Sequence, residues 1–212
     1  PPLFISQYSP SYYYSGFSFI EIYNPTPETV YLEDIRFAQA ISSNTSNSYE
    51  NIYSFPAGSF ILPYDTYVIY DSNYNSNNFV SDYNFSSISL SGDDAFGIIH
   101  CGSTSYYNNS CMSQTLLDIV GDWYGDPGTG WSVAGVSNAT AYNTLIRKCN
   151  ITEGNSNWTQ SSGVDTENSE WEVVSSNYTT SYNYNNYTHY QTIGTHCVLF
   201  GCIDSLACNY DD

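Results

Sequence analysis

The sequence predicts an all-β sandwich, and three observations lead to that class. Runs of β-branched and aromatic residues recur at short spacing, separated by Pro, Gly, Asn and Asp. No segment carries a convincing helical period, in which apolar residues would return every three or four positions. The 212 residues are enough to bury one substantial core. Short strands between turn residues are the pattern of two packed antiparallel sheets.

The expected strands can be justified in chain order. The first expected strand, residues 17–23, alternates in hydrophobicity and stops at Asn24-Pro25. A turn at Pro63-Tyr64-Asp65 joins the expected strands 60–62 and 67–70. Two further apolar runs, residues 95–99 and 116–120, bracket a polar loop between Cys101 and Cys111. The polar stretches Ser42–Tyr53 and Asp71–Tyr83 are expected to be loops. The predicted strands are residues 17–23, 29–32, 60–62, 67–70, 95–99 and 116–120.

The charge balance excludes two classes of partner. The chain has 21 acidic and 3 basic residues, a formal charge of −18, and charged residues make up only 11% of it. Nucleic acid and anionic membranes are therefore disfavoured, because both need clustered Lys and Arg. No apolar run is long enough to span a bilayer. The acidity either attracts divalent cations or simply keeps a secreted protein soluble.

Six segments, in order, carry a resemblance to a known family: residues 3–8, 19–25, 91–95, 117–121, 126–131 and 144–148. They resemble the lamin tail domain in its secreted microbial form, over about residues 3–199. The resemblance implies an immunoglobulin-like β-sandwich over residues 1–200 that serves as a binding or assembly module rather than an active site. It also favours an ordered edge hairpin over low-complexity disorder for Tyr178–Tyr190.

Residues 201–212 resemble the start of a separate, short, Cys-rich and acidic repeat of secreted microbial and algal-virus proteins. The usual form is Gly-Cys-Thr-Asp-x-x-Ala-x-Asn-Tyr, followed by an acidic stretch that ends in a further cysteine. Here the sequence stops before that cysteine, so we expect the natural polypeptide to continue.

The six cysteines predict three disulfides in an oxidising compartment. Cys101 and Cys111 flank a polar loop between two apolar runs, which indicates a bridged hairpin. Cys202–Cys208 lie together in the tail motif, where the missing cysteine is a competing partner. Cys149–Cys197 then follows by elimination.

Eight Asn-x-Ser/Thr sequons point to a glycosylated exterior in a eukaryotic host. Chance alone supplies about five in a chain this rich in Asn, Ser and Thr, so the count is weak evidence by itself. The sequon asparagines are Asn44, Asn84, Asn108, Asn138, Asn150, Asn157, Asn177 and Asn186.

Four aspartates form the best candidate ligand set. Asp93, Asp94, Asp118 and Asp126 could supply the oxygens that calcium needs. In the alternative interpretation, the loop aspartates cap tight turns by accepting backbone N–H bonds. Glu21 is expected to face outward from an alternating strand or to pair with Arg147.

No catalytic motif is present, and we expect neither catalysis nor a required cofactor. His100, His189 and His196 are the candidate bases. Four tryptophans could stack on sugars, although Trp131 fits a core position of the family.

The preferred hypothesis is a non-enzymatic, glycosylated extracellular protein that self-assembles head to tail into a filament or surface layer. The 23 tyrosines support it, because they are too many for one core and exposed aromatic patches mark interfaces. One alternative is a calcium-assisted carbohydrate-binding or adhesion domain. Another is an accessory domain of a secreted nuclease or phosphatase.

Overall fold

The structure of the protein is a computed structural model that describes residues 2–10, 18–41, 51–71, 81–85, 88–104, 111–175 and 193–197. Strands dominate these ranges. Their only helical elements are two short ones, α1 (Ala139–Tyr142) and α2 (Trp158–Ser162). The predicted all-β sandwich is confirmed.

One layer is a six-stranded sheet with the order β12-β11-β1-β2-β7-β8. Its neighbours pair antiparallel, except β7 and β8, which are parallel. The register of β1 against β2 shifts between Ile5 and Gln7, which places a bulge at Ser6. The strands are β1 (Phe4–Ser9), β2 (Phe19–Tyr23), β7 (Thr66–Asp71), β8 (Tyr83–Phe85), β11 (Asn143–Arg147) and β12 (Trp171–Ser175).

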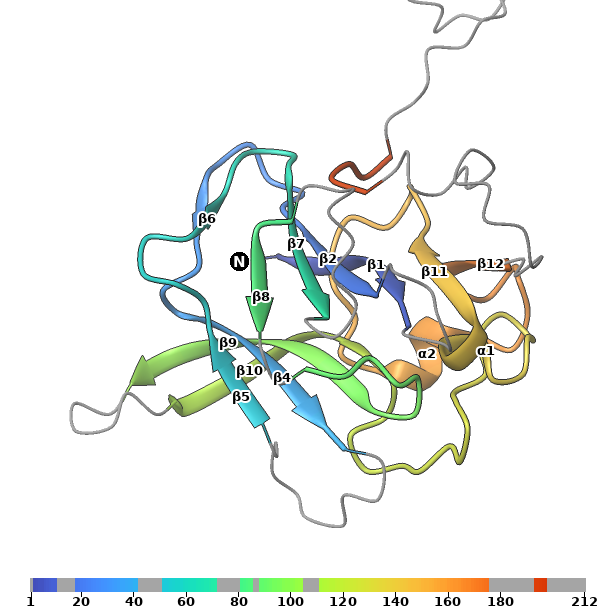
Figure 1. Cartoon of the computed structure of the whole chain (residues 1–212). Coiled ribbons are helices and arrows are strands. Elements are labelled where there is room, and N and C mark those ends of the chain that lie inside the picture. Colours follow the sequence, from blue (N-terminus) through green and yellow to red (C-terminus); the bar gives the residue numbers. More distant parts are fainter. Residues whose placement is uncertain are drawn as a thin grey trace, which may run out of the picture.

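The other layer is a four-stranded antiparallel sheet with the order β10-β9-β4-β5, which lies below the first sheet in Figure 1. A separate two-stranded ribbon pairs β3 with β6. The four strands are β4 (Ile35–Ala40), β5 (Asn51–Ser54), β9 (Ala95–Thr104) and β10 (Cys111–Val120). The ribbon strands are β3 (Val30–Tyr31) and β6 (Phe60–Ile61).

The core fills the space between the sheets with aromatic and branched side chains. Phe37 of β4 and Phe96 of β9 stack with ring centroids 5.9 Å apart, and Tyr8 of β1 lies 6.1 Å from Phe96. Ile20 and Ile22 enter the same core from β2. Alternation along the strands thus places one face of each sheet inside.

A close approach at Gly92 fixes the entry to β9. Its φ is +97°, and a Cβ there would lie 2.5 Å from the backbone of Ala141 in α1. Only glycine meets both conditions, so the Ser91-Gly92-Asp93 turn can pack directly on α1.

Some strand assignments differ from the sequence expectation. The polar composition of residues 51–53 predicts a loop, but they belong to β5, whose partner is β4. Backbone pairing with a central strand overrides their polar composition. Tyr83, the end of the second predicted loop, begins β8. The stretch Tyr178–Tyr190 and the tail 201–212 lie outside the described residues. Within the described ranges, no helix is long and apolar enough to cross a membrane.

Candidate functional site

Arg147 of β11 lies at the centre of a buried ion network. Its guanidinium donates to Asp118 Oδ2 at 2.5 Å and to Glu170 Oε2 at 2.6 Å. It also donates to Ser161 Oγ at 3.0 Å and to the carbonyl oxygen of Ile5 at 3.2 Å. Because Ile5 is in the six-stranded sheet and Asp118 is in the four-stranded one, this network joins the two layers.

Asp118 is a structural residue and not a metal ligand. Besides Arg147, it accepts N–H bonds from Ile5 at 2.7 Å and from Asn155 at 2.8 Å. Complete burial raises the pKa of Asp118, and the nearby charge of Arg147 opposes that rise. Its oxygens are therefore occupied by three donors. The sequence missed this pairing because Arg147 is on a different strand, 29 residues further along the chain.

The other predicted calcium ligands are engaged separately. Asp94 accepts from Gln39 Nε2 at 2.7 Å, and Asp93 accepts from the Ser91 hydroxyl. Asp126 accepts from the backbone N–H of Gly128 at 2.8 Å, the turn-capping role of the alternative interpretation. In the part of the chain that the structure describes, no three His, Cys, Asp or Glu side chains gather as a metal centre would require. The four-aspartate site is thus wrong as a single constellation.

The tryptophans do not form a sugar-stacking platform. Trp171 is fully buried and stacks on the Arg147 guanidinium, 3.8 Å from the guanidinium carbon to the ring centroid. Its indole N–H donates to Ser161 Oγ at 2.9 Å. Trp123 and Trp158 are also buried, and Trp131 packs against the core as predicted.

Glu21 of β2 is buried, although the sequence predicted an outward-facing residue or a partner for Arg147. Its Oε1 accepts from Ser6 Oγ at 2.6 Å and from Gln7 Nε2 at 3.3 Å. Its Oε2 accepts from the backbone N–H of Gly194 at 2.6 Å, and the backbone N–H of Thr195 also bonds the carboxylate. Burial raises the pKa of Glu21 to about 7, and these donors oppose the rise.

The segment that covers Glu21 is Ile193–Cys197, which we call the strap. His196 of the strap lies between two rings, with centroids 5.4 Å from Phe4 and 4.7 Å from Tyr23. Burial, together with the nearby charge of Arg147, lowers the pKa of His196 to about 4. His196 is therefore neutral at physiological pH and packs as an aromatic ring. His100 lies in β9, and His189 lies outside the described residues.

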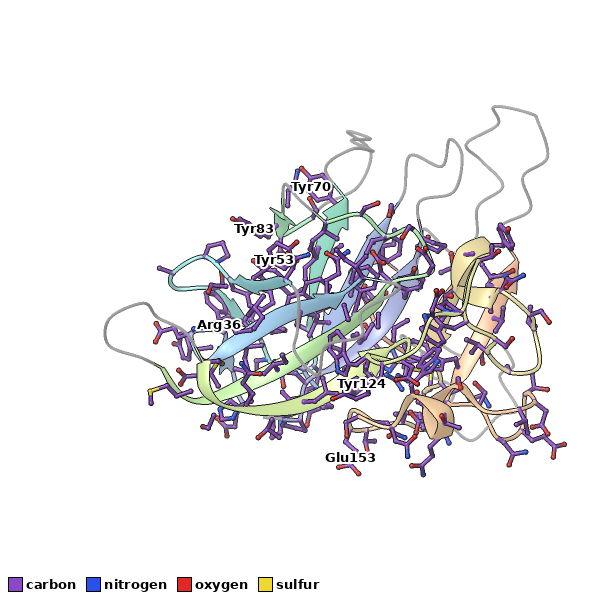
Figure 2. The ribbon with its side chains drawn as sticks, turned by 90° about the horizontal axis from the view of Figure 1, so that it is seen from below. Arg36, Tyr53, Tyr70, Tyr83, Tyr124 and Glu153 are labelled. Carbon is purple, nitrogen blue, oxygen red and sulfur yellow. A yellow bond between two sulfur atoms is a disulfide. The ribbon has the colours of Figure 1, made fainter. Side chains whose placement is uncertain are left out.

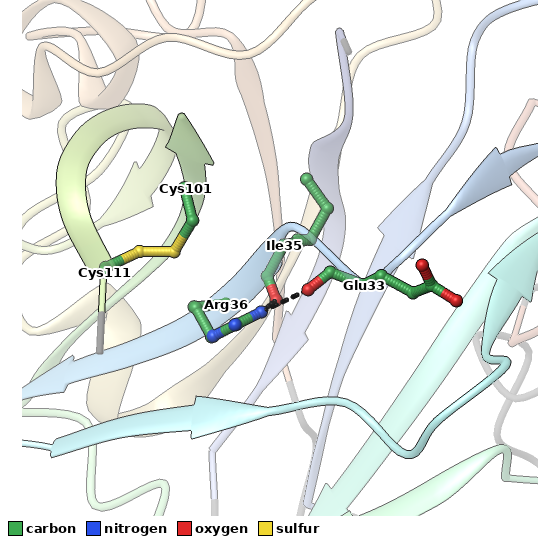
Figure 3. Close-up of a disulfide and its surroundings, with 5 residues drawn as sticks. All are labelled: Glu33, Ile35, Arg36, Cys101 and Cys111. Carbon is green, nitrogen blue, oxygen red and sulfur yellow. Dashed lines mark hydrogen bonds between the residues drawn. A yellow bond between two sulfur atoms is a disulfide. The ribbon is translucent and has the colours of Figure 1, made fainter. Parts of the chain in front are cut away.

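Two disulfides join the expected pairs. Cys101–Cys111 closes the β9–β10 hairpin, and Cys149–Cys197 ties the strap to the segment after β11. Figure 3 shows Arg36 beside the hairpin disulfide, where it donates to the carbonyl oxygens of Glu33 at 2.6 Å and Ile35 at 2.8 Å. Cys202 and Cys208 lie outside the described residues.

Exposed apolar side chains gather on the β3–β6 ribbon and the turn that follows it. Tyr31 and Phe60 face each other across the ribbon, with ring centroids 6.1 Å apart, and are 64% and 48% exposed. Leu62 and Tyr64 continue the surface at 49% and 61% exposure. We call these four residues the ribbon patch. Sequence reasoning expected exposed tyrosines but did not locate them.

Other tyrosines are spread over the molecule. In Figure 2, Tyr53, Tyr70 and Tyr83 lie toward the upper left of the molecule, and Tyr124 lies apart from them, lower in the view. The first three are half-buried and Tyr124 is exposed.

Four of the eight sequon asparagines fall within the described ranges, and they differ in access. Asn150 and Asn157 are exposed. Asn138 is half-buried at the start of α1, and Thr140 of its sequon is buried, with its hydroxyl bonded to the Gly92 carbonyl oxygen at 2.6 Å. Asn84 has a fully buried side-chain oxygen. Asn44, Asn108, Asn177 and Asn186 lie outside the described residues.

No family model matches this sequence. No curated protein matches it either. A solved structure of a DUF4876 family protein from Bacteroides thetaiotaomicron VPI-5482 is similar at 14% identity, over 81% of this chain and 70% of that chain, with a TM-score of 0.44. A likeness of this degree carries no functional argument, and the lamin-tail resemblance stays a prediction.

Proposed function

We propose that this chain is a non-enzymatic extracellular structural module that associates with copies of itself, head to tail, into a filament or surface layer. The observation that carries the proposal is the ribbon patch. Tyr31, Phe60, Leu62 and Tyr64 bring four large apolar side chains, each about half exposed or more, to one two-stranded ribbon. Contiguous exposed apolar surface of this kind marks protein–protein contact sites.

The sheet edges add support. β5 and β8 each end a sheet, and Ile52 on β5 is 43% exposed. Proteins commonly protect such edges with lysine. The single lysine of this chain, Lys148, lies after β11 and donates to the carbonyl oxygen of Ser169 at 2.6 Å. Charge therefore gives these edges little protection against pairing with another chain.

The covalent features fit an exterior location. Two disulfides are typical of an oxidising compartment, and Asn150 and Asn157 present exposed sequons. A glycosylated, disulfide-stabilised sandwich of the lamin-tail type is the corresponding proposal for the mature protein.

The proposal is tested by light scattering and negative-stain microscopy on the full chain at micromolar concentration. We expect multimers for the natural sequence and monomers for Tyr31→Ser combined with Phe60→Ser. The matched control is Met112→Ser combined with Val164→Ser, since these side chains are 71% and 79% exposed but lie in β10 and just after α2 instead of on the β3–β6 ribbon. A monomeric natural sequence, or equal loss of association in both double variants, would contradict the proposal.

A further inference from the structure

The strap occupies a socket on the six-stranded sheet, and three kinds of contact hold it there. The carboxylate of Glu21 accepts backbone N–H bonds, two rings enclose His196, and Cys149 forms the disulfide. The socket residues come from β1, β2 and the segment after β11. They are Phe4, Ser6, Gln7, Glu21, Tyr23 and Cys149.

The socket favours an occupant with backbone donors, because the strap completes the hydrogen bonding of its acid. Glu21 is 0% exposed, and both ion pairs among the described residues belong to Arg147 rather than to Glu21. A buried carboxylate is tolerated when hydrogen-bond donors surround it. The strap supplies two of them, the N–H groups of Gly194 and Thr195.

The socket also selects the shape of its occupant. Gly194 has a φ of +84°, which lets the strap turn sharply and direct successive N–H groups at one carboxylate. An aromatic ring and a cysteine must then follow within three residues. This arrangement recognises one short peptide turn, and this chain carries it at residues 193–197.

The connection to the strap is long enough to reach a neighbouring molecule. Seventeen residues, 176–192, separate the end of β12 from the strap. A chain of that length spans at most about 55 Å when extended. A domain of this size is about 40 Å across. The covalent chain therefore permits the strap to dock on its own sandwich or on an adjacent one.

We infer that the socket is an assembly site that takes the strap of a second copy of this chain. The inference rests on the proposed self-association, which holds neighbouring sockets and straps near one another and raises their local concentration. Every contact made within one molecule is reproduced between two, so the exchange forfeits no contact and follows the logic of domain swapping. Successive copies are then linked by Cys149–Cys197 disulfides.

The covalent step is redox-neutral. A small-molecule thiolate attacks Cys197 Sγ, forming a mixed disulfide and releasing the Cys149 thiolate. The same attack on the neighbour frees the neighbour's Cys149 thiolate. After the strap moves, that thiolate attacks Cys197 Sγ and expels the small thiolate, so each disulfide within a molecule becomes one between molecules. Cys197, the residue attacked, is half-buried and its partner Cys149 is exposed, so the disulfide lies at the surface.

The test uses the full natural chain in two isotopic forms. Protein labelled with ¹⁴N and protein labelled with ¹⁵N are mixed equally in a glutathione redox buffer, allowed to associate, alkylated and digested with chymotrypsin. Mass spectrometry then measures the isotopic composition of each disulfide-linked peptide pair. Random exchange between copies gives about half of the Cys149–Cys197 pairs one light and one heavy peptide, whereas docking within a molecule gives none. Cys101–Cys111 is the internal control and should remain unmixed, because it closes a hairpin of adjacent strands.

Light scattering on the same samples separates the two proposals. Assembled protein with unmixed Cys149–Cys197 peptides overturns the inference and leaves self-association intact. Monomeric protein with unmixed peptides overturns both. Equal mixing in the hairpin control also overturns the inference, because it shows unselective disulfide scrambling. Mixed Cys149–Cys197 with an unmixed control supports exchange at the socket.

Discussion

Replacing Arg147 by methionine should lower the free energy of unfolding by about 3–5 kcal/mol at neutral pH. Methionine keeps an apolar chain in the space but leaves the buried carboxylate of Asp118 without its cation. Breaking a buried ion pair from one side is expensive because the remaining charge stays away from water. The stacking of the guanidinium on Trp171 is lost as well.

Arg36→Met is the matched control, because Arg36 is also buried but donates to backbone carbonyl oxygens instead of an acid. Its loss should be about 1.5–3 kcal/mol, the range for hydrogen bonds to a charged group. Urea unfolding monitored by tryptophan fluorescence, with the disulfides intact, gives the free energy of unfolding of both variants. We expect Arg147→Met to be the less stable variant by about 2 kcal/mol.

The pH dependence identifies the cause. Without Arg147, only the backbone N–H bonds from Ile5 and Asn155 oppose the burial that raises the pKa of Asp118, so that pKa rises further. A carboxyl group with a raised pKa contributes stability below its unfolded value and loses it as the pH rises through its folded value. The deficit of Arg147→Met should therefore shrink between pH 7 and pH 4, while that of Arg36→Met stays constant. Equal losses in the two variants, or a deficit of Arg147→Met that does not change with pH, would refute the reasoning.

Four further predictions concern the strap and its socket, the glycans and a turn. The raised pKa of Glu21, about 7, makes its contribution fall as pH rises from about 4.5 to 7, so Glu21→Gln should flatten that loss in pH-dependent unfolding. The pKa of His196 is lowered to about 4, so its contribution to the free energy of unfolding falls as the pH drops from about 6.5 toward 4. His196→Phe should therefore gain stability relative to the natural chain at pH 5. In a eukaryotic host, peptide mass spectrometry should find glycan at the exposed Asn150 more often than at the half-buried Asn138, and equal occupancy would contradict the role of access. Gly163→Ala should lower the thermal midpoint by several degrees, because its φ is +63° and a Cβ would lie 2.4 Å from backbone; an unchanged midpoint would show that the turn can relax.

The strands were predictable because alternation is a local signal. Ile20 and Ile22 define the inward face of β2, and the turn at Pro63-Tyr64 separates β6 from β7, as the structure has them. β5 was not predictable, because its Asn and Ser residues give no alternation and pairing with β4 decides its conformation. Local pattern thus reports on strands that bury a face and says little about edges.

The candidate site was only partly predictable, for a related reason. Alternation correctly sets Glu21 on the opposite face of β2 from Ile20 and Ile22. It predicts exposure for that face, because it contains no information about a segment 173 residues away that covers the carboxylate. The prediction for Asp118 is wrong for a similar reason. The local sequence around an aspartate in a strand is the same whether a cation or water faces its carboxylate. Partners far apart in the chain separate the two cases.

The placement of the three basic residues has a consequence for how two copies approach each other. Arg36 and Arg147 are buried, and Lys148 is half-buried with its ammonium group on carbonyl oxygens. Almost all fixed charge at the surface is therefore negative, and each molecule behaves as a small polyanion surrounded by mobile cations. Two such molecules repel until counterions screen them, over about 8 Å at physiological ionic strength. Association through apolar side chains therefore depends on ionic strength. Low salt keeps the copies apart, and higher salt lets them come together.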